Sequence, residues 1–539
     1  MADLAAAVEV LPSKKSRLDS TLNKRPSGVS IAIFLAALAG GLCYIALHVA
    51  RDMQEVTVTS IWPYLLLALA LLIALGFEFV NGFHDTANAV AMVIYTHSLE
   101  PTTAVVLSGM CNLAGVLASS GAVAFAIITL LPVELILQVS SGAGFAMVFA
   151  LLVAAILWNL GTWWLGLPAS SSHTMVGSII GVGIANQLFN PHIGASGVDW
   201  EQAIKVLKAL LISPVVGFGT AALLMLLSKW LIKYPSLYEA PKDKQPPPWP
   251  IRALTVLTCT GVSFFHGSND GQKGMGLIML ILIGTMPTAY ALNHAITANG
   301  MQEFIAASEQ AGHILDRHVD QHAILGSDAR AEVTDYIRTQ QLRPETILAL
   351  RELVAEVNHE VTLYKVFKSV PAQEQTNVRN DMYVAGEALR LMARTHNPAF
   401  TTEESAALKN YVGELDKSTK FIPDWVKVAV ALALGLGTMV GWRRVVVTVG
   451  EKIGKEHLTY AQGACAGLVA MGTIFVADTF GLPVSTTHIL SSGVAGTMAA
   501  NGSGLHMSTI RNIAAVWVFT LPAAALLSGL LYWLFRAIS

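Results

Sequence analysis

The chain has 539 residues, 53% of them hydrophobic and only 13% charged. Soluble domains carry about 25% charged residues, so this composition excludes an ordinary soluble protein and indicates an all-α protein that crosses a membrane many times. The net charge of −2 supplies no general basic surface, which excludes nucleic acid as a partner. The four cysteines lie inside apolar segments without paired spacing, so they predict neither disulfides nor a metal site.

The chain begins with a polar tail, residues 1–27, whose lysines and arginines favour the cytoplasmic side of the membrane. An extra N-terminal transmembrane helix and loop follow over residues 28–60. Apolar segments long enough to span predict about eleven crossings, within a range of 10–12. They are residues 28–50, 61–95, 102–125, 143–166, 174–190, 201–228, 253–290, 421–441, 458–480, 488–500 and 510–535.

Two polar stretches interrupt this apolar pattern. Residues 229–252 are rich in lysine and proline and predict a cytoplasmic linker. Residues 291–420 predict a soluble, helical insertion, because the part from 300 to 420 holds 31 of the chain's 70 charged side chains. Counting crossings from a cytoplasmic N-terminus puts this insertion outside the cytoplasm.

One polar motif occurs twice within the apolar segments. Its first copy is Asn81-Gly-Phe-His-Asp-Thr-Ala-Asn88, and its second is His266-Gly-Ser-Asn-Asp-Gly-Gln-Lys273. Ionisable side chains at membrane depth are costly, so they generally face a protein cavity and mark the path of an ion or substrate.

A second motif also occurs twice, as Leu167-Pro-Ala-Ser-Ser-Ser-His173 and Leu482-Pro-Val-Ser-Thr-Thr-His488. The aspartates of the first motif lie 185 residues apart and the histidines of the second lie 315 apart. The difference matches the length of the charged insertion. Two repeats are therefore predicted, one over residues 61–228 and the other over residues 253–290 and 421–539.

The charges of equivalent loops indicate how the repeats are oriented. Loop 126–142 contains no lysine or arginine, whereas its counterpart, 441–457, contains four. Equivalent loops on opposite sides of the membrane predict inverted repeats, which in secondary transporters meet at broken or re-entrant helices near the midplane.

The Pro-Ser/Thr motifs suit an oxyanion. The proline interrupts each helix, and the hydroxyl residues then stand at the N-terminal end of the next helix, where free N–H groups and the helix dipole attract negative charge. These hydroxyl residues are Ser170, Ser171, Ser172, Ser485, Thr486 and Thr487. The alternative is structural, because Ser and Thr in membrane helices also bond to neighbouring helices.

Asp85 and Asp270 alone would repel an anion, so they fit a site that also takes a cation or a proton. Asn88 is a candidate ligand, and its counterpart Lys273 either neutralises Asp270 or contacts the anion. Glu78 lies on roughly the same helix face as Asp85 and is a candidate for the proton path. His84, His173, His266 and His488 flank the motifs and suit either proton transfer or metal binding. No metal ligand is assigned, with His173, His266 and His488 as the possible ones.

With these residues in view, the chain resembles the inorganic phosphate transporter (PiT) family, in its bacterial low-affinity branch. The resemblance rests on residues 81–91, 158–163, 167–173, 266–274, 441–444 and 482–488, and covers nearly all of residues 60–535. It implies secondary transport of phosphate through two inverted repeats, as a homodimer in the bacterial inner membrane. The phosphate site that it implies here is Asp85, Asn88, Ser170, Ser171, Ser172, Asp270, Ser485, Thr486 and Thr487.

The resemblance also bears on what is cotransported. Sodium-coupled members carry an asparagine at both positions where this chain has Asn88 and Lys273, so the lysine disfavours sodium. The bacterial branch implies proton symport of a neutral complex of phosphate with Mg²⁺ or Ca²⁺, with no resident cofactor. The coupling candidates are Asp85, Asp270, Glu78, His84 and Lys273. A sulfate permease, a divalent-metal transporter, a channel and an intramembrane enzyme are the alternatives, although no nucleophile–base pair supports an enzyme.

Overall fold

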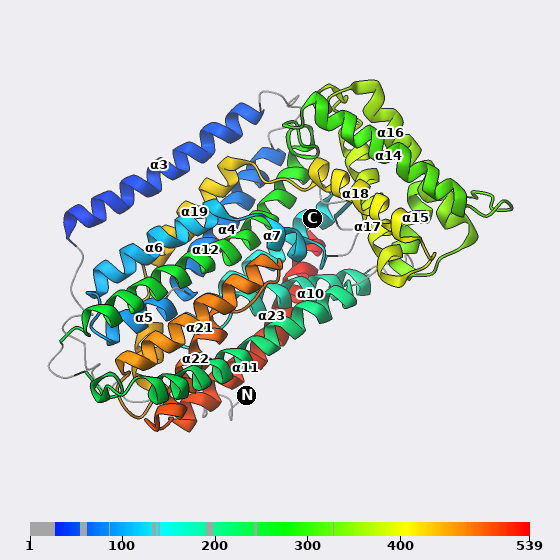
Figure 1. Cartoon of the computed structure of the whole chain (residues 1–539). Coiled ribbons are helices and arrows are strands. Elements are labelled where there is room, and N and C mark those ends of the chain that lie inside the picture. The colour runs from blue at the N-terminus through cyan, green and yellow to red at the C-terminus, as the bar shows by residue number, and fades with distance from the viewer. Residues whose placement is uncertain are drawn as a thin grey trace.

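A computed structural model describes residues 27–53, 62–85, 87–131, 136–137, 141–189, 198–241, 245–326 and 328–538. Helices form nearly all regular structure in these residues, with one isolated β-bridge between Gly454 and Leu505. They build a long bundle that carries a second group of helices at one end (Figure 1). The polar tail predicted for residues 1–27 lies outside the described residues, apart from Ser27.

Seven helices of the described residues are long and apolar enough to cross a membrane, or eight if the bent pair α18 (Thr402–Thr419) and α19 (Asp424–Thr438) is counted as one span. Five of the seven are α3 (Gly28–Asp52), α6 (Pro101–Ala118), α9 (Gly142–Trp164), α11 (Trp200–Leu231) and α23 (Met507–Ile538). The others are α21 (Tyr460–Thr479) and a span from Tyr64 to Tyr95 formed by α4 (Trp62–Asp85) and α5 (Ala87–Tyr95).

This number is lower than the eleven apolar segments of the sequence because several of them form helices that are short or carry polar motifs. α10 (Ser171–Phe189) and α22 (Thr486–Asn501) each begin inside the polar Pro-Ser/Thr motif, and α22 has only 16 residues. α19 has only 15 residues. α12 (Trp249–Thr285) is long, with 37 residues, but contains the polar motif around Asp270.

The two halves pack reciprocally. α6 packs on α12 while α19 packs on α4, and α10 packs on α23 while α22 packs on α11. In the two predicted repeats, α4 corresponds to α12, α6 to α19, α10 to α22 and α11 to α23. Exchanging the repeats therefore turns the α6–α12 contact into the α19–α4 contact, and the α10–α23 contact into the α22–α11 contact. The same exchange relates His173 to His488, whose ring centroids lie 4.5 Å apart, so these equivalent residues meet where the halves join.

Four glycines at close helix crossings follow the same symmetry, because a Cβ at each would overlap a backbone oxygen of the neighbouring helix. A Cβ on Gly82 would lie 2.3 Å from the carbonyl oxygen of Leu434, and one on Gly267 would lie 2.1 Å from that of Asn112. The corresponding distances are 2.1 Å from Gly437 to the Phe79 oxygen and 1.9 Å from Gly115 to the Phe264 oxygen. Glycine therefore allows α4 and α19 to cross as closely as α12 and α6 do.

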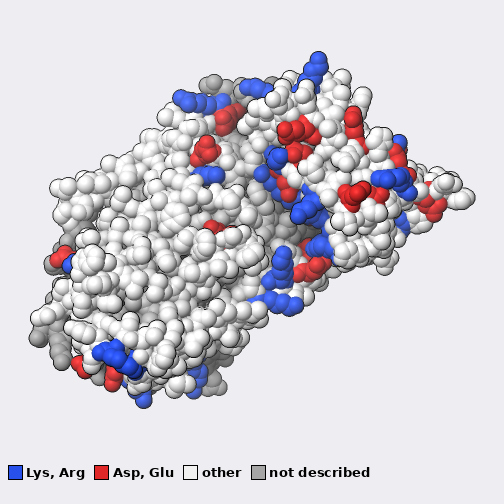
Figure 2. Space-filling view, viewed as in Figure 1, with Lys and Arg blue, Asp and Glu red and all other residues white. Residues whose placement is uncertain are grey.

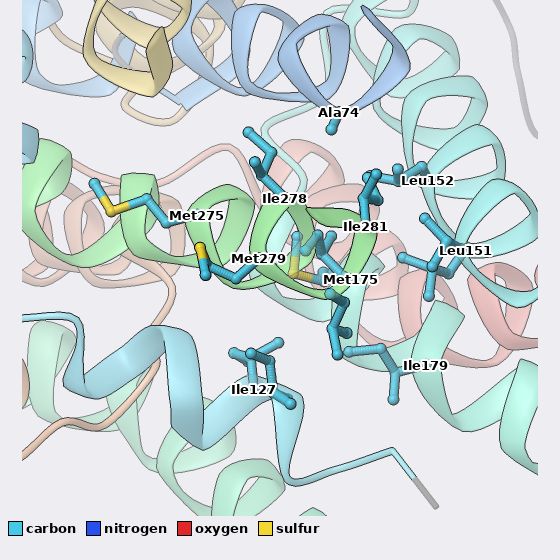
Figure 3. Packing of buried hydrophobic residues seen from close by; sticks show 14 of the residues in the cluster. Ala74, Ile127, Leu151, Leu152, Met175, Ile179, Met275, Ile278, Met279 and Ile281 are labelled. Atoms are coloured by element: carbon cyan, nitrogen blue, oxygen red, sulfur yellow. The ribbon is translucent and has the colours of Figure 1, made fainter. Parts of the chain in front are cut away.

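α12 runs through the centre of the bundle. Its C-terminal half presents Met275, Ile278, Met279 and Ile281 to buried side chains of α4, α7 (Ala122–Ile128), α9 and α10 (Figure 3). Residues 266–282 of this helix are buried without interruption. A polar motif in its middle is thus shielded from lipid on all sides, which is the setting that buried charges require.

The predicted insertion forms a separate helical layer with its own hydrophobic core. It comprises α14 (Ala298–His318), α15 (Ala329–Thr339), α16 (Pro344–Tyr364), α17 (Gln375–Thr395) and α18. Charged side chains gather on this layer, whereas the bundle surface is mostly uncharged (Figure 2). The domain boundaries and the side of the membrane on which the insertion lies stay predictions.

Candidate substrate-binding site

The Pro-Ser/Thr motifs place two helix N-termini in the interior of the bundle. The Ser485 hydroxyl caps α22 by accepting a hydrogen bond from the His488 N–H, at 3.1 Å. The Ser170 hydroxyl accepts the equivalent bond from the His173 N–H, at 3.2 Å. Pro168 and Pro483 stand before these caps, where a proline cannot continue a helix but fits an extended approach to one. Both halves therefore present hydroxyl groups and helix N-termini, as the sequence predicts.

The two motif aspartates meet at these N-termini. Asp85 ends α4, Asp270 lies in the middle of α12, and both are almost completely buried. The Ser171 hydroxyl oxygen lies 2.5 Å from Asp85 Oδ2 and 3.2 Å from Asp270 Oδ2. From the other half, the Thr487 hydroxyl donates to Asp85 Oδ1 at 2.8 Å. Residues from all four motifs thus form one cluster.

Lys273 supplies the positive charge of this cluster. Its Nζ lies 2.7 Å from Asp270 Oδ1, one helical turn away, and it also hydrogen-bonds to the Ser172 hydroxyl. The Ser172 hydroxyl in turn donates to the carbonyl oxygen of Val484 at 2.8 Å, which joins the two Pro-Ser/Thr motifs. Lys273 is therefore placed to neutralise Asp270, which is one of the two roles that the sequence leaves open for it.

Two histidines lie beside the aspartates. His84 Nδ1 is 2.9 Å from Asp85 Oδ1, and its Nε2 is 3.1 Å from the Thr162 hydroxyl. His266 Nδ1 contacts Asn112 Oδ1 at 2.9 Å, while its Nε2 has no hydrogen bond and lies 3.6 Å from Asp270 Oδ2. Ligand atoms of Asp85, His266 and Asp270 all lie within 4.8 Å of one another. Among the described residues, this is the one group of three such side chains able to hold a metal ion.

A narrow cavity opens beside this group. It is lined by Asp85, Ser263, His266, Thr486 and apolar side chains. The Thr486 hydroxyl and His266 Nε2 make no hydrogen bond, so the cavity contains two unused polar atoms, both from the second half. No space within it is wide enough for a water molecule, so a larger ligand requires the surrounding helices to separate.

Comparison with known proteins shows the family to which the chain belongs. A family model described as the phosphate transporter family matches residues 81–528, which include all four motifs. The chain belongs to this family. Family membership places the protein among membrane transporters and not among enzymes.

Curated relatives of this phosphate transporter family member match over nearly their whole length. The low-affinity inorganic phosphate transporter PitA of Escherichia coli K12 is 40% identical over 490 residues, covering 87% of this chain and 96% of PitA. PitB of the same strain is 39% identical, over 88% of this chain and 97% of its own. A probable low-affinity inorganic phosphate transporter of Bacillus subtilis is 27% identical, over 88% and 99%.

A solved structure, described as the sodium-dependent phosphate transporter, aligns with 88% of this chain and 100% of its own. The sequence identity is 19% and the TM-score is 0.47.

Two histidines of this transporter lie apart from the aspartates. His173 and His488 pack on each other, and His488 also stacks on Trp517 with ring centroids 4.1 Å apart. Neither belongs to the group of possible metal ligands among the described residues. Of the three histidines that the sequence offers as metal ligands, only His266 therefore lies with the carboxylates.

Glu78 is fully buried on α4, two helical turns before Asp85. One carboxylate oxygen accepts a hydrogen bond from the Asn81 amide at 3.3 Å, and the other has no partner. A Cβ on Gly274 would lie 2.3 Å from this free oxygen, so the carboxyl group packs against α12 next to Lys273. Asn88 lies in α5, but its side chain is outside the described part of the structure.

Sequence analysis did not identify three polar residues that position the cluster. Asn112 holds His266 and donates to the Thr438 hydroxyl at 2.9 Å. Thr162 contacts His84, and Asn159 accepts a hydrogen bond from Thr174 at 3.0 Å. Asn159 and Thr162 lie in residues 158–163, which carry the family resemblance, whereas Asn112 shows only as a polar residue in a largely apolar helix.

Proposed function

We propose that the protein imports inorganic phosphate by secondary active transport, in symport with protons and as a neutral complex of phosphate with a divalent metal such as Mg²⁺ or Ca²⁺. Two observations support phosphate as the substrate. The curated relatives with 39–40% identity are named inorganic phosphate transporters. The cluster also combines hydroxyl donors and two helix N-termini, which suit a tetrahedral oxyanion.

The observation that carries this proposal is the meeting of Asp85 and Asp270 at Ser171. A hydroxyl group has one hydrogen, so Ser171 donates to one carboxylate at a time. A hydrogen bond from the second carboxyl to Ser171 requires a proton on that carboxyl. A proton shared within this group would relieve the repulsion between two buried carboxylates, and it is the proton that we assign to symport.

The charges of the cluster favour a neutral complex over bare phosphate. Asp85, Asp270 and Lys273 together carry a net charge of −1 when both carboxyl groups are ionised and the histidines are neutral. Before the proton binds, a phosphate dianion would be repelled by this charge in a medium of low dielectric constant. A divalent cation removes the repulsion, and Asp85, Asp270 and His266 Nε2 provide a ligand set for it.

In this proposal Ser170, Ser171, Ser172, Ser485, Thr486, Thr487 and Asn88 surround the phosphate oxygens. Asp85 and Asp270 bind the metal or the proton. Lys273, His84 and Glu78 set the charge around them. We further propose that the protein is a homodimer in a bacterial inner membrane, with the insertion outside the cytoplasm.

Replacing Asp85 tests this assignment. Asp85→Asn keeps the shape of the side chain but removes its charge and its proton-binding site, so we expect saturable phosphate uptake by proteoliposomes to be abolished. Glu451→Gln is the matched control, because Glu451 accepts a hydrogen bond from the Tyr95 hydroxyl outside the cluster. Uptake by Asp85→Asn with unchanged KM and kcat would refute the role of this carboxylate.

Sulfate is the second candidate substrate, because it is also a tetrahedral oxyanion. Competition by excess sulfate against labelled phosphate separates the two: we expect sulfate to leave phosphate uptake unchanged. Uptake of labelled divalent metal without phosphate would instead support a metal transporter.

A further inference from the structure

A second cavity lies between the insertion and the membrane bundle. It is small, about 20 Å³, and is lined from the insertion by Arg379 and Tyr383 of α17 and by Lys420. On the bundle side it is lined by Thr129, just after α7, and by the last part of α12, including Met279 and Ile283. The cavity therefore touches the same helix that carries Asp270 and Lys273.

Arg379 is the unusual residue of this cavity. It is buried, with 4% of its surface exposed, and among the described residues no carboxylate lies within ion-pair distance of it. Its Nη1 donates to Asn380 Oδ1 at 3.1 Å and to the Ile136 carbonyl oxygen at 3.5 Å, and its Nε has no partner. The guanidinium lies 5.2 Å from the centre of the Tyr383 ring. All these neighbours are neutral.

Other arginines of the insertion are paired. Arg330 lies 2.5 Å from Asp381 and Arg351 lies 2.7 Å from Asp316. These carboxylates raise the pKa of both arginines through hydrogen bonds. Burial lowers the pKa of Arg379 instead. Lys420, across the cavity, contacts Glu387 and Asp416 at 3.4 and 3.1 Å.

A buried charge without a counter-charge is expensive, and arginine does not lose its proton in proteins. The cost is removed when an anion occupies the cavity beside the guanidinium. Its planar fork of N–H groups matches phosphate oxygens in pairs. The cavity is otherwise uncharged on its bundle side, so an anion there would meet no opposing carboxylate from α7 or α12.

We propose that the Arg379 cavity is a second oxyanion site, occupied by inorganic phosphate before it reaches the substrate site. This inference rests on the proposed function and gives the insertion a part in it. Met279 and Ile283 follow Lys273 by six and ten residues, which corresponds to about 9–15 Å along the axis of α12. Phosphate bound there would be concentrated next to the helix that leads to Asp270.

The test uses the full-length Asp85→Asn protein in lipid-free detergent micelles, so that the substrate site is impaired and the second site is intact. Thermal unfolding is followed as inorganic phosphate is added. We expect phosphate to raise the Tm in this background, because a ligand that binds only the folded state stabilises it. Adding Arg379→Gln should raise the half-maximal phosphate concentration at least about tenfold, as expected for loss of a charge-assisted hydrogen bond.

Arg394→Gln is the matched control, because Arg394 lies on the same helix but is exposed and paired with Glu201 at 3.3 Å. It should leave the phosphate effect unchanged. In phosphate-free buffer, Arg379→Gln should be at least as stable as its parent, since it removes a buried unpaired charge. A lower Tm there would mean that Arg379 is structural and would overturn the proposal.

A second arm distinguishes free phosphate from lipid phosphate. If phosphatidylglycerol, and not inorganic phosphate, raises the Tm in an Arg379-dependent way, the occupant is a lipid headgroup and the phosphate assignment is wrong. If neither does, the second site does not exist. Uptake by the wild-type protein is measured separately, so failure of the second site is distinguishable from failure of the proposed function: only the latter abolishes wild-type uptake.

Discussion

At the scale of single residues, Ser171 is the most informative side chain of the cluster. It is the first residue of α10, it is buried, and its hydroxyl is within hydrogen-bond distance of a carboxylate from each half. Apart from Ser171, Asp85 has direct contacts with Thr487 and His84, whereas Asp270 has a direct contact with Lys273. Ser171 therefore links the aspartates of the two halves through a single hydroxyl group.

Removing this hydroxyl should affect binding more than folding. In Ser171→Ala, a buried carboxylate loses a charge-assisted hydrogen bond, which typically contributes about 1.5–3 kcal/mol. We expect the KM for phosphate to rise at least about tenfold in proteoliposome uptake. Ser178→Ala, on the same helix, removes a buried hydroxyl that hydrogen-bonds to the Thr174 carbonyl oxygen at 2.8 Å, its one hydrogen-bond partner among the described residues, and should leave KM unchanged. Equal KM values for the two variants would contradict the coupling role of Ser171.

The repeated motifs predicted four residues that gather here, Asp85, Asp270, Ser171 and Thr487. They were not sufficient to predict which side chains of the cluster contact each other. The sequence left Lys273 between Asp270 and the anion, and it treated four histidines alike. Such details depend on the rotation and register of helices that are distant in sequence, and sequence spacing within one helix carries no information about them.

At the scale of helices, the closest crossings depend on glycine. Gly115 of α6 meets the backbone of α12, and its counterpart Gly437 of α19 meets the backbone of α4. Both crossings hold a motif aspartate in place, because α12 carries Asp270 and α4 ends at Asp85. Hydropathy predicted these helices, but it could not show which glycines face a neighbour, because glycine is common in membrane helices generally.

An added methyl group at these crossings should separate the helices. In Gly115→Ala and in Gly437→Ala the new Cβ would overlap a backbone oxygen, and overpacking typically costs about 1–3 kcal/mol. We expect both variants to lower the Tm of the purified protein and to reduce phosphate uptake. Gly472→Ala is the control, since a Cβ there would meet nothing within 4 Å and alanine favours a helix. A Tm equal to that of the wild type in either crossing variant would argue against these contacts.

At the scale of the whole molecule, two halves enclose a polar cluster that has no room for its substrate. The narrow cavity at Asp85 and the contact between His173 and His488 both lie where the halves meet. Transport therefore requires the halves to move relative to each other, as inverted-repeat transporters do. The sequence predicted the repeats, the extra α3 and the helical insertion; the cavity beneath the insertion depends on contacts between segments that no motif connects.

The central claim is that a pH gradient and a divalent metal together drive phosphate uptake. The most direct test is uptake of labelled phosphate by proteoliposomes of the purified protein, with an imposed pH gradient, with and without Mg²⁺, and with a sodium gradient as the alternative driving force. Our account predicts accumulation only when the pH gradient and Mg²⁺ are both present, because Lys273 occupies the position of a sodium ligand and the net charge of the cluster excludes bare phosphate. Accumulation driven by sodium alone, without metal or pH gradient, would contradict it.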